Sequence, residues 1–476
     1  MAIRALKTIL FPTPMQKPSF LHLSNFSTYS TPDNPQSMIS TVVAVLTHQR
    51  SKSRWAHLRS LRPNGFAPSE FSQIALHLKN NPHLALRFFL WTHRNSLCDH
   101  NLSSYSTLIH ILARGRLKRQ ALIVLRDAIR VSRLENGELE SKPLKVFETL
   151  VKTYRQCGSA PFVFDLLIEA CLDLKKIDSS IEIVRMLISR RISPRFSTCC
   201  SLIQQVSQRH GPNEGYKMYK EIFGSNCGAV EPSVEIFNTL MVAFYQDGIF
   251  EKVKEIWEQM LGLNCDPNCY SYSILMAVYC DEGKMDEAEN LWEEMRAKNV
   301  EFDVVAYNTI IGGFCGIGEV EKAEEFFREM GLSGLDGSAT TYEHFVKGYC
   351  KVGNVDSALL VFKDMLRTGF RPEGLTMERL IRGLCEKSRG LEAWEILRVA
   401  KGRFGFCLMR KSLEFLVMGL CQEGKMGEAL KLQRQMVSEG FEPNCEIYDA
   451  FISGYMEQGN VEMAEKLRME MLEIGV

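Results

Sequence analysis

The residues best suited to metal binding or nucleophilic chemistry are fifteen cysteines and ten histidines. Zinc ribbons, deaminase-type zinc sites and thiol redox motifs need closely spaced ligand pairs such as CxxC. No CxxC occurs, and the nearest spacings are Cys199 beside Cys200 and Cys265 with Cys269. The histidines are not grouped with cysteines or acids. We therefore predict no metal site and no cofactor.

Motifs of phosphate-binding and hydrolytic enzymes are also missing. The sequence contains no P-loop and no H-x-E followed by a cysteine pair, and Gly316 and Gly318 lack the third glycine and the preceding strand of a dinucleotide-binding loop. We predict that the chain is not an enzyme, has no catalytic residues and takes no small-molecule substrate. No uninterrupted apolar window reaches membrane-spanning length, so no contact with a membrane is expected.

Several residue types recur along the C-terminal half at a spacing of 35 residues. The methionine series is Met260, Met295, Met330, Met365, Met436 and Met471. Glycine follows the same spacing at Gly248, Gly283, Gly318, Gly353, Gly424 and Gly459, and cysteine at Cys280, Cys315, Cys350, Cys385 and Cys421. A single inserted residue near 402–409 explains the one longer step. Such self-similarity indicates a repeat array whose units bury their apolar faces against neighbours.

Each repeat predicts two amphipathic helices. In residues 304–338 the apolar residues of the first helix, Ala306 to Gly316, and of the second, Val320 to Met330, recur at helical spacing on one side. Gly318 between them permits the left-handed backbone that ends a helix. The recurring cysteine ends the apolar side of the first helix, so we interpret it as a small core residue.

Twelve units are expected within residues 66–476, one of them degenerate, with a loop insertion at 137–143. Their expected bounds are 66–101, 102–136, 144–160 (degenerate), 161–195, 196–233, 234–268, 269–303, 304–338, 339–373, 374–409, 410–444 and 445–476. Residues 32–65 remain unassigned. No extra domain is expected after the last unit.

The N-terminus, residues 1–31, has the composition of a transit peptide. It carries Arg4, Lys7 and Lys17 without an acidic residue, is rich in Ser and Thr, and places Ile3 and Leu6 on one helical face. Because this basic amphipathic helix begins at the very N-terminus, we expect import into the mitochondrial matrix, with the chloroplast as the alternative.

Charge differs between the two halves of a chain with equal totals. Residues 1–233 hold 31 Lys and Arg against 16 Asp and Glu (31 − 16 = +15), and residues 234–476 hold 26 against 41 (26 − 41 = −15). The N-terminal half is thus the better electrostatic partner for a polyanion, unless the charges simply cover solvent-facing helices.

The units closely resemble the pentatricopeptide-repeat (PPR) family, on segments such as VAYNTIIGGFCGIGEVEKAEEFFREM and FNTLMVAFYQDGIFEKVKEIWEQM. Uniform spacing resembles the P-type subclass of plant organelles. The resemblance implies an all-α fold, a right-handed α-solenoid of helix-turn-helix repeats of about 35 residues. It also implies a concave groove in which each unit binds one base of single-stranded RNA.

In this family the fifth and last residues of a unit recognise the base, and the second residue packs against it. Carried over, the resemblance assigns Asn238 with Asn268 and Asn308 with Ser338 to pyrimidines, Ser273 with Asp303 to guanine, and the packing role to Tyr270 and Val305. The competing interpretation of each Asn, Asp or Ser is a helix cap or turn residue. Other units carry pairs without an evident base, such as Asp165 with Arg195, Cys200 with Ser233, Glu343 with Glu373, Glu378 with Met409, and Glu414 with Asn444.

Two functions therefore compete. One is a sequence-selective single-stranded RNA-binding protein that acts in mitochondrial RNA processing, stability or translation by occupying RNA in its groove. The other is a structural or protein-binding solenoid, for example a subunit associated with the mitochondrial ribosome, for which the acidic C-terminal units are natural. The expected partners are organellar RNA in the first case and the ribosome or other RNA-processing proteins in the second.

Overall fold

The computed structural model describes residues 35–48, 55, 58, 59, 62–131, 142–224, 232–405 and 410–474. Every regular element among these residues is an α-helix, as the sequence predicts, and none of the helices is long and apolar enough to cross a membrane. The expected transit peptide lies outside the described residues. The chain divides into two compact units, residues 1–243 (unit 1) and residues 244–476 (unit 2).

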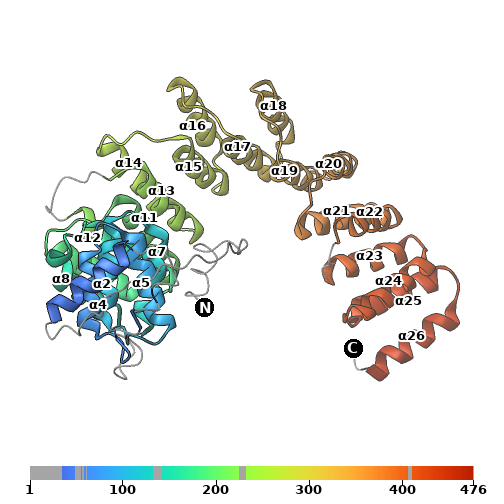
Figure 1. Ribbon diagram of the computed structural model, residues 1–476. Coiled ribbons are helices and arrows are strands. Elements are labelled where there is room, and N and C mark those ends of the chain that lie inside the picture. The colour runs from blue at the N-terminus through green and yellow to red at the C-terminus, as the bar shows by residue number, and fades with distance from the viewer. Residues whose placement is uncertain are drawn as a thin grey trace. The chain divides into compact units, whose positions relative to one another are not determined.

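The helices of unit 1 are α2 (Pro35–His48), α4 (Pro68–His77), α5 (Pro82–Arg94), α6 (Leu102–Arg114), α7 (Lys118–Val131), α8 (Lys142–Cys157), α9 (Phe162–Asp173), α10 (Ile177–Ser189), α11 (Phe196–His210) and α12 (Pro212–Phe223) (Figure 1). Helix α13 (Val234–Gln246) contains the division between the two units.

The helices of unit 2 follow one another as regular hairpins: α14 (Phe250–Gly262), α15 (Cys269–Asp281), α16 (Met285–Ala297), α17 (Val304–Ile317), α18 (Val320–Leu332), α19 (Ala339–Lys351), α20 (Val355–Thr368), α21 (Gly374–Glu386), α22 (Gly390–Phe404), α23 (Arg410–Gln422), α24 (Met426–Ser438), α25 (Cys445–Glu457) and α26 (Val461–Ile474). The odd-numbered members from α15 are the first helices of their repeats. Together with the helical hairpins of unit 1, they form the predicted all-α helical-repeat solenoid.

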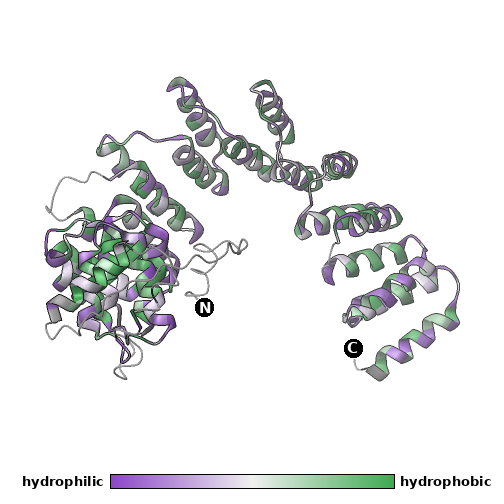
Figure 2. Cartoon of the chain, in the orientation of Figure 1, coloured by the Kyte–Doolittle hydropathy of each residue, from purple (hydrophilic) through white to green (hydrophobic). Residues whose placement is uncertain are grey.

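The hairpin of α17 and α18 shows how the sequence builds a repeat. Tyr307 and Phe314 are buried on α17, and Ala323 and Met330 are buried on α18, as their helical spacing predicts. Gly318, between the helices, has φ of 100°, a left-handed conformation that glycine adopts without strain. Figure 2 shows the apolar residues of the hairpins on the sides where helices meet.

Successive first helices of unit 2 approach each other at a glycine and a cysteine. A Cβ atom on Gly313 would lie 2.4 Å from Cys280 Sγ, and one on Gly348 would lie 2.9 Å from Cys315 Cβ. The same contact recurs between Gly419 and Cys385. A small residue is therefore needed on both sides, which explains why cysteine recurs at this place. Burial raises the pKa of the Cys315 thiol to about 12, so the thiol stays protonated and behaves as a core side chain.

Replacing Gly313 by alanine is expected to destabilise unit 2 by about 1–2 kcal/mol, because overpacking of this contact outweighs the helix propensity gained. Urea unfolding followed by circular dichroism measures the change. Gly331→Ala is the matched control, since a Cβ there meets nothing within 4 Å and should stabilise helix α18. An unchanged Gly313→Ala midpoint would show that the close contact is absent.

Unit 1 contains a polar network between α6 and α8. His110 is fully buried, and its Nε2 lies 3.0 Å from both the carbonyl oxygen of Leu150 and the Oγ1 of Thr153. The hydroxyl groups of Ser106 and Thr153 are 2.6 Å apart. Burial is the main reason why the pKa of His110 falls from 6.5 to about 4. The network therefore holds a neutral imidazole in the core.

Candidate RNA interface

The last residues of three repeats cap the first helices of the repeats that follow. The Asn268 side chain accepts a hydrogen bond from the backbone N–H of Ser271 at 3.0 Å, and Asp303 accepts one from Ala306 at 2.8 Å. Ser338 caps α19 in the same way. Each of these residues has extended backbone angles, as helix N-caps require. The capping role is thus present at these positions, whatever their role toward RNA.

Replacing Asp303 by alanine is expected to cost about 1 kcal/mol, because the cap of α17 is lost. The expected result is faster amide exchange in the first turn of α17, measured by hydrogen exchange. Asp303→Asn keeps the acceptor and should exchange like the wild type. Equal exchange in the alanine variant would contradict the capping role.

The structure brings the fifth and last residues of repeat 304–338 together. The Asn308 amide nitrogen donates to Ser338 Oγ at 2.9 Å, and the Thr341 hydroxyl donates to the Asn308 amide oxygen at 2.5 Å. Asn308 and Ser338 are both half-buried. The two side chains therefore present donor and acceptor atoms at one place, although a base must compete with their mutual hydrogen bonds.

Ser273 and Asp303 meet around the thiol of Cys269. Burial raises the pKa of Cys269 to about 11, and both side chains form hydrogen bonds with the thiol. The Ser273 hydroxyl also donates to the Cys269 carbonyl oxygen at 2.9 Å, and only 3% of Ser273 is exposed. Asp303 is exposed. Of this pair the carboxylate is thus the accessible group.

Asn238 lies on α13 with 5% of its surface exposed, and its partner by sequence, Asn268, is exposed at the start of α15. These two residues belong to different compact units. Their pairing stays a prediction.

The second residues of three repeats are exposed apolar side chains. Tyr270 is 47% exposed and Val305 49% exposed, as a residue that packs against a base must be. Leu375, at the same place in repeat 374–409, is 48% exposed and was missed by the sequence reasoning. The regular spacing of the second positions along the repeats is the signal that identifies Leu375.

A surface pocket of about 420 Å³ lies on the first helices α15, α17 and α19. Its lining includes Val305 and Asn308 together with His344 and Lys347, two residues that sequence reasoning did not select. The His344 ring covers Gly312, where a Cβ would lie 2.8 Å from the ring. Burial lowers the pKa of His344 to about 4. The pocket thus combines an apolar side chain, an amide, a neutral imidazole, an exposed ammonium group and the carboxylate of Asp281.

Other repeats place carboxylates where a base would be recognised. Glu343 accepts a hydrogen bond from the backbone N–H of Glu373 at 2.8 Å, and Glu414 accepts one from the Asn444 amide at 3.3 Å. Burial raises the pKa of Glu343 above its usual range. These side chains keep the geometry of the fifth and last positions, but their charge disfavours a nearby phosphate.

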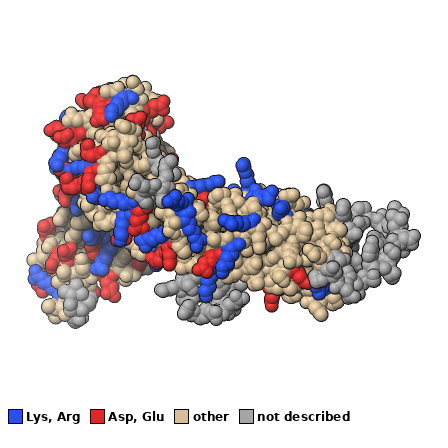
Figure 3. Space-filling view, turned by 90° about the vertical axis from the view of Figure 1, so that its left-hand side faces the viewer, with Lys and Arg blue, Asp and Glu red and all other residues tan. Residues whose placement is uncertain are grey.

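Basic side chains gather where α6 and α8 end. Arg114 lies 3.6 Å from the Cβ position of Gly158, directly after α8. Five basic side chains on α6, α7 and α8 and in the turn after α6 are exposed: Arg114, Arg116, Arg119, Lys152 and Arg155. Lys and Arg side chains also lie close together near the middle of the face in Figure 3. Exposed basic side chains thus occur near the ends of both α6 and α8.

Among the described residues no group of three His, Cys, Asp or Glu side chains could hold a metal ion. The cysteines of the repeats lie apart from one another on successive helices, each next to a glycine rather than to a second ligand.

Comparison with known proteins gives the following matches. The PPR repeat family profile matches residues 302–351 and 338–386, and PPR repeat profiles match residues 235–265, 263–296, 415–441 and 446–476. A pentatricopeptide repeat-containing protein of Arabidopsis thaliana is 56% identical over 490 residues, which cover 99% of this chain and 98% of that protein. A mitochondrial one from the same plant is 24% identical and covers 42% of this chain and 41% of its own length.

Among solved structures, the maize pentatricopeptide repeat protein PPR10 is 16% identical, with a TM-score of 0.42 over 92% of this chain and 74% of that chain. Its complex with an 18-nt psaJ RNA element is 17% identical, with a TM-score of 0.42 over 93% and 79%. The sequence identity to the first Arabidopsis relative extends over nearly the whole of both chains. The chain therefore belongs to the pentatricopeptide-repeat family.

Proposed function

We propose that the chain is a sequence-selective single-stranded RNA-binding protein whose first helices in unit 2 hold the RNA. The observation that carries the proposal is the hydrogen bond of 2.9 Å between Asn308 and Ser338, with Asn308 in a pocket that the exposed Val305 also lines. Short donor and acceptor side chains can meet a Watson–Crick edge, and the apolar neighbour can pack against the base. Membership of the PPR family supports this use of the positions.

The bound sequence follows from consecutive repeats. Repeats 234–268 and 304–338 carry Asn-based pairs and favour pyrimidines, and repeat 269–303 carries Ser273 with Asp303 and favours guanine. Tyr270 and Val305 pack against bases from exposed positions on α15 and α17, and stacking on an aromatic side chain contributes about 1–3 kcal/mol per base. The expected core of the target is pyrimidine-G-pyrimidine.

In this region the cations that can contact phosphates lie on α19. Lys347 is exposed in the pocket, and Lys351 donates to the carbonyl oxygen of Gly316 from the end of the same helix. Lys347 is the single Lys or Arg among the residues that line this pocket, and Asp281 adds a carboxylate to the lining. Because each phosphate neutralised by a cation contributes to salt dependence, we expect a shallow salt dependence of affinity for a target that occupies only unit 2.

The site of action that we propose is the mitochondrial matrix, where bound protein would protect, expose or help process an organellar transcript. The transit-peptide composition of residues 1–31 and the mitochondrial designation of several relatives support it. The chloroplast is the alternative. No catalytic group is needed, because a stably bound solenoid can block a nuclease or keep RNA unpaired.

A protein-binding solenoid is the second candidate. The observation that favours it is the half-buried Glu343, hydrogen-bonded to the Glu373 backbone, together with Glu414 at the corresponding place. These repeats keep the fold of their neighbours while presenting carboxylates, which suits a basic protein surface such as that of a ribosomal subunit better than RNA.

Crosslinking in isolated mitochondria distinguishes the two candidates. Tagged protein is crosslinked, bound RNA is sequenced, and the same extract is run on a ribosome gradient. A sharp footprint that contains pyrimidine-G-pyrimidine is the expected result. Diffuse crosslinks together with comigration of the protein with one ribosomal subunit would reject selective binding in favour of the second candidate.

A further inference from the structure

The pocket on α15, α17 and α19 contains a histidine without a hydrogen-bond partner. His344 lies on α19, and its ring covers Gly312 of α17, where a Cβ atom would lie 2.8 Å from the ring. Within the described part of the chain neither ring nitrogen forms a hydrogen bond. Because burial lowers the pKa of His344 to about 4, the ring is uncharged at neutral pH and offers one donor and one acceptor. A ligand in the pocket can therefore accept from one nitrogen and donate to the other.

Helices α17 and α19 lie parallel along this pocket. Near their starts the Thr341 hydroxyl donates to the Asn308 amide oxygen, and near their ends Lys351 donates to the carbonyl oxygen of Gly316. The His344 ring lies between these two contacts. Positions along the two helices can therefore be compared directly.

Groups of three kinds follow one another along the two helices. Val305 and Asn308 lie in the first half of α17 and suit a base. His344 lies about one turn further along, against Gly312. Lys347 follows His344 after one turn of α19 and is exposed. A base site, an uncharged donor and acceptor, and a cation therefore occur in the same order as the base, ribose and phosphate of a nucleotide.

The two sides of the pocket differ in charge. Asp281 lines the α15 side, and its carboxylate disfavours a phosphate group. Lys347 lines the α19 side and favours one. The sugar–phosphate backbone of a bound nucleotide is therefore expected on the α19 side of the pocket, which places its ribose next to His344.

Histidine at this place is particular to one repeat. His344 is the sixth residue of repeat 339–373, and the sixth residues of the other repeats from 269 onward are Ile274, Thr309, Arg379, Phe415 and Ala450. In the adjacent repeat the Thr309 hydroxyl already donates to the Val305 carbonyl oxygen at 2.8 Å. The free imidazole therefore does not follow from the repeat pattern and belongs to this one pocket.

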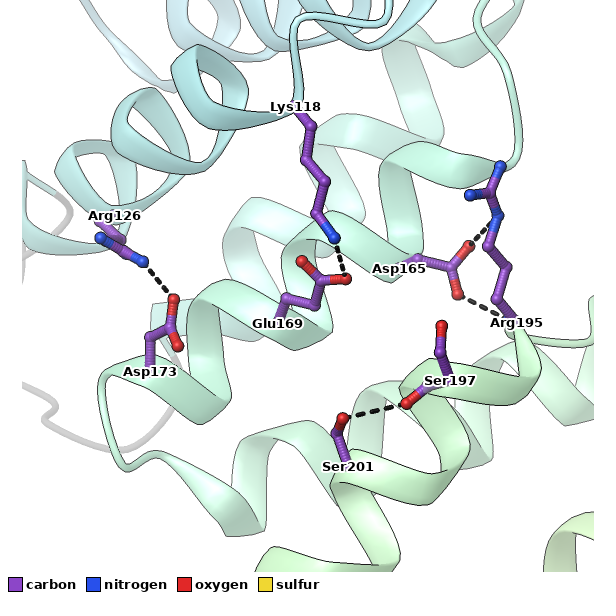
Figure 4. Close-up of polar contacts among 8 residues, drawn as sticks. All are labelled: Lys118, Arg126, Asp165, Glu169, Asp173, Arg195, Ser197 and Ser201. Atoms are coloured by element: carbon purple, nitrogen blue, oxygen red, sulfur yellow. Dashed lines mark hydrogen bonds and ion pairs between the residues drawn. The ribbon is translucent and has the colours of Figure 1, made fainter. Parts of the chain in front are cut away.

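The equivalent face of a first helix is closed in unit 1. Repeat 161–195 carries carboxylates at its fifth, ninth and thirteenth residues, which are Asp165, Glu169 and Asp173 (Figure 4). Each of them forms an ion pair with a basic side chain of unit 1. Repeat 304–338 has an asparagine and two glycines at these places. Helix α17 therefore adds no charge to its pocket and leaves it open.

We propose that His344 binds the 2′-hydroxyl group of the nucleotide whose base is recognised by repeat 304–338. This inference rests on the proposed function and deepens it, because it adds recognition of RNA over DNA to recognition of the base. A 2′-hydroxyl group is both a donor and an acceptor, which matches an uncharged imidazole, whereas deoxyribose offers neither atom there. Loss of one such hydrogen bond weakens binding by about 3- to 10-fold in Kd.

Single deoxyribose substitutions test this assignment on the full-length chain. The first probe is a fluorescent single-stranded RNA that the wild type selects from a pool with a fixed pyrimidine-G-pyrimidine core and randomised flanks. Three further probes each carry one core nucleotide in its 2′-deoxy form. Fluorescence anisotropy gives Kd for the wild type and for His344→Phe, which keeps a ring over Gly312 without hydrogen-bonding atoms. His344→Gln keeps a donor and an acceptor, and Lys347→Gln is the matched control. Circular dichroism confirms that the variants fold alike.

In the wild type, removing the 2′-hydroxyl group of one terminal pyrimidine should weaken binding by about 3- to 10-fold, and the other two core positions should not respond. This loss should be absent in His344→Phe and partly kept in His344→Gln. Lys347→Gln should weaken all four probes alike and keep the loss, because it removes a phosphate contact.

An equal loss in the wild type and His344→Phe would overturn the assignment, and so would the absence of a loss at every core position. In both cases selective RNA binding would stand. Failure of the wild type to prefer RNA with the pyrimidine-G-pyrimidine core over RNA with other cores would reject the proposed function, and the assignment with it.

Discussion

Unit 1 is expected to lose about 4 kcal/mol of stability when the pH falls from 7 to 5, because it buries two neutral histidines. Burial lowers the pKa of His110 from 6.5 to about 4. Burial, with a smaller contribution from His93, lowers the pKa of His100 from 6.5 to about 3. Because the pKa of each histidine is lower in the folded chain than in the unfolded chain, the unfolded chain binds a proton at a pH where the folded chain does not. The free energy of unfolding is therefore highest above pH 6.5 and declines below it.

The magnitude follows from linkage. At pH 5 most of the unfolded imidazoles are protonated while the folded ones are still neutral, which costs about 2 kcal/mol for each histidine. The loss continues until the pH reaches the folded pKa values of about 4 and about 3. His100 is held in an aromatic cluster, with ring centroids 4.5 Å from Phe71 and 4.3 Å from Phe89, so it cannot be hydrated without opening the core.

Hydrogen exchange measured between pH 7 and pH 5 and corrected for intrinsic rates checks this prediction. Peptides from α6 and α8 should lose protection, whereas peptides from α23 to α25, which contain no histidine, should not. His110→Gln is the informative variant, because its amide can keep the contacts to Leu150 and Thr153 without titrating. It should remove about half of the pH dependence. An unchanged slope in this variant would show that His110 is not its source.

Replacing Asn308 by alanine is expected to weaken binding to a cognate RNA by about 1–3 kcal/mol, or about 5- to 150-fold in Kd. The loss should depend on the base that repeat 304–338 recognises: RNAs with a pyrimidine there lose affinity, and RNAs with a purine there do not. In the wild type, part of the free energy gained when the base binds is offset, because Asn308 must break its hydrogen bonds to Ser338 and Thr341. Fluorescence anisotropy with RNAs that differ at this one base measures the effect.

Asn354→Ala is the matched control for this experiment. Asn354 is also an asparagine of unit 2, but it caps the second helix α20, and its loss removes a cap without touching the first helices. It should lower stability slightly and leave Kd unchanged. A uniform weakening of all RNAs by Asn308→Ala, or a loss in the control of equal size, would show that Asn308 supports the fold and not base recognition.

The regular part of the fold follows from local sequence. Met295, Met330 and Met365 are fully buried, as their constant spacing predicts, and Gly318 ends α17 in a left-handed conformation. These features depend on contacts within a repeat or between adjacent repeats, so a period in the sequence is sufficient to reveal them.

The parts that the sequence did not reveal depend on contacts between distant segments. The position of α8 is defined by the contacts of His110 and Ser106 with residues 40 or more positions away, in a stretch where the period is interrupted. Likewise, Glu169 and Asp173 look like solvent-facing charges in the sequence, and only their proximity to Lys118 and Arg126 shows that they join two helices. The recognition pairs remain predictions, since a hydrogen bond between Asn308 and Ser338 is compatible with recognition and with simple capping.

The caps at repeat boundaries have a consequence for how new specificities can arise. Asn268, Asp303, Ser338 and Asn444 all sit at the start of a first helix and accept a backbone hydrogen bond there. Asn, Asp and Ser are also nearly equivalent as N-caps. Exchanging one for another can therefore alter which base is preferred at almost no cost to folding. Glu373 makes no such side-chain bond at the start of α21, so it cannot be exchanged in this way without changing the cap. Changing the RNA target by mutation should therefore be simplest in the repeats from α15 to α19.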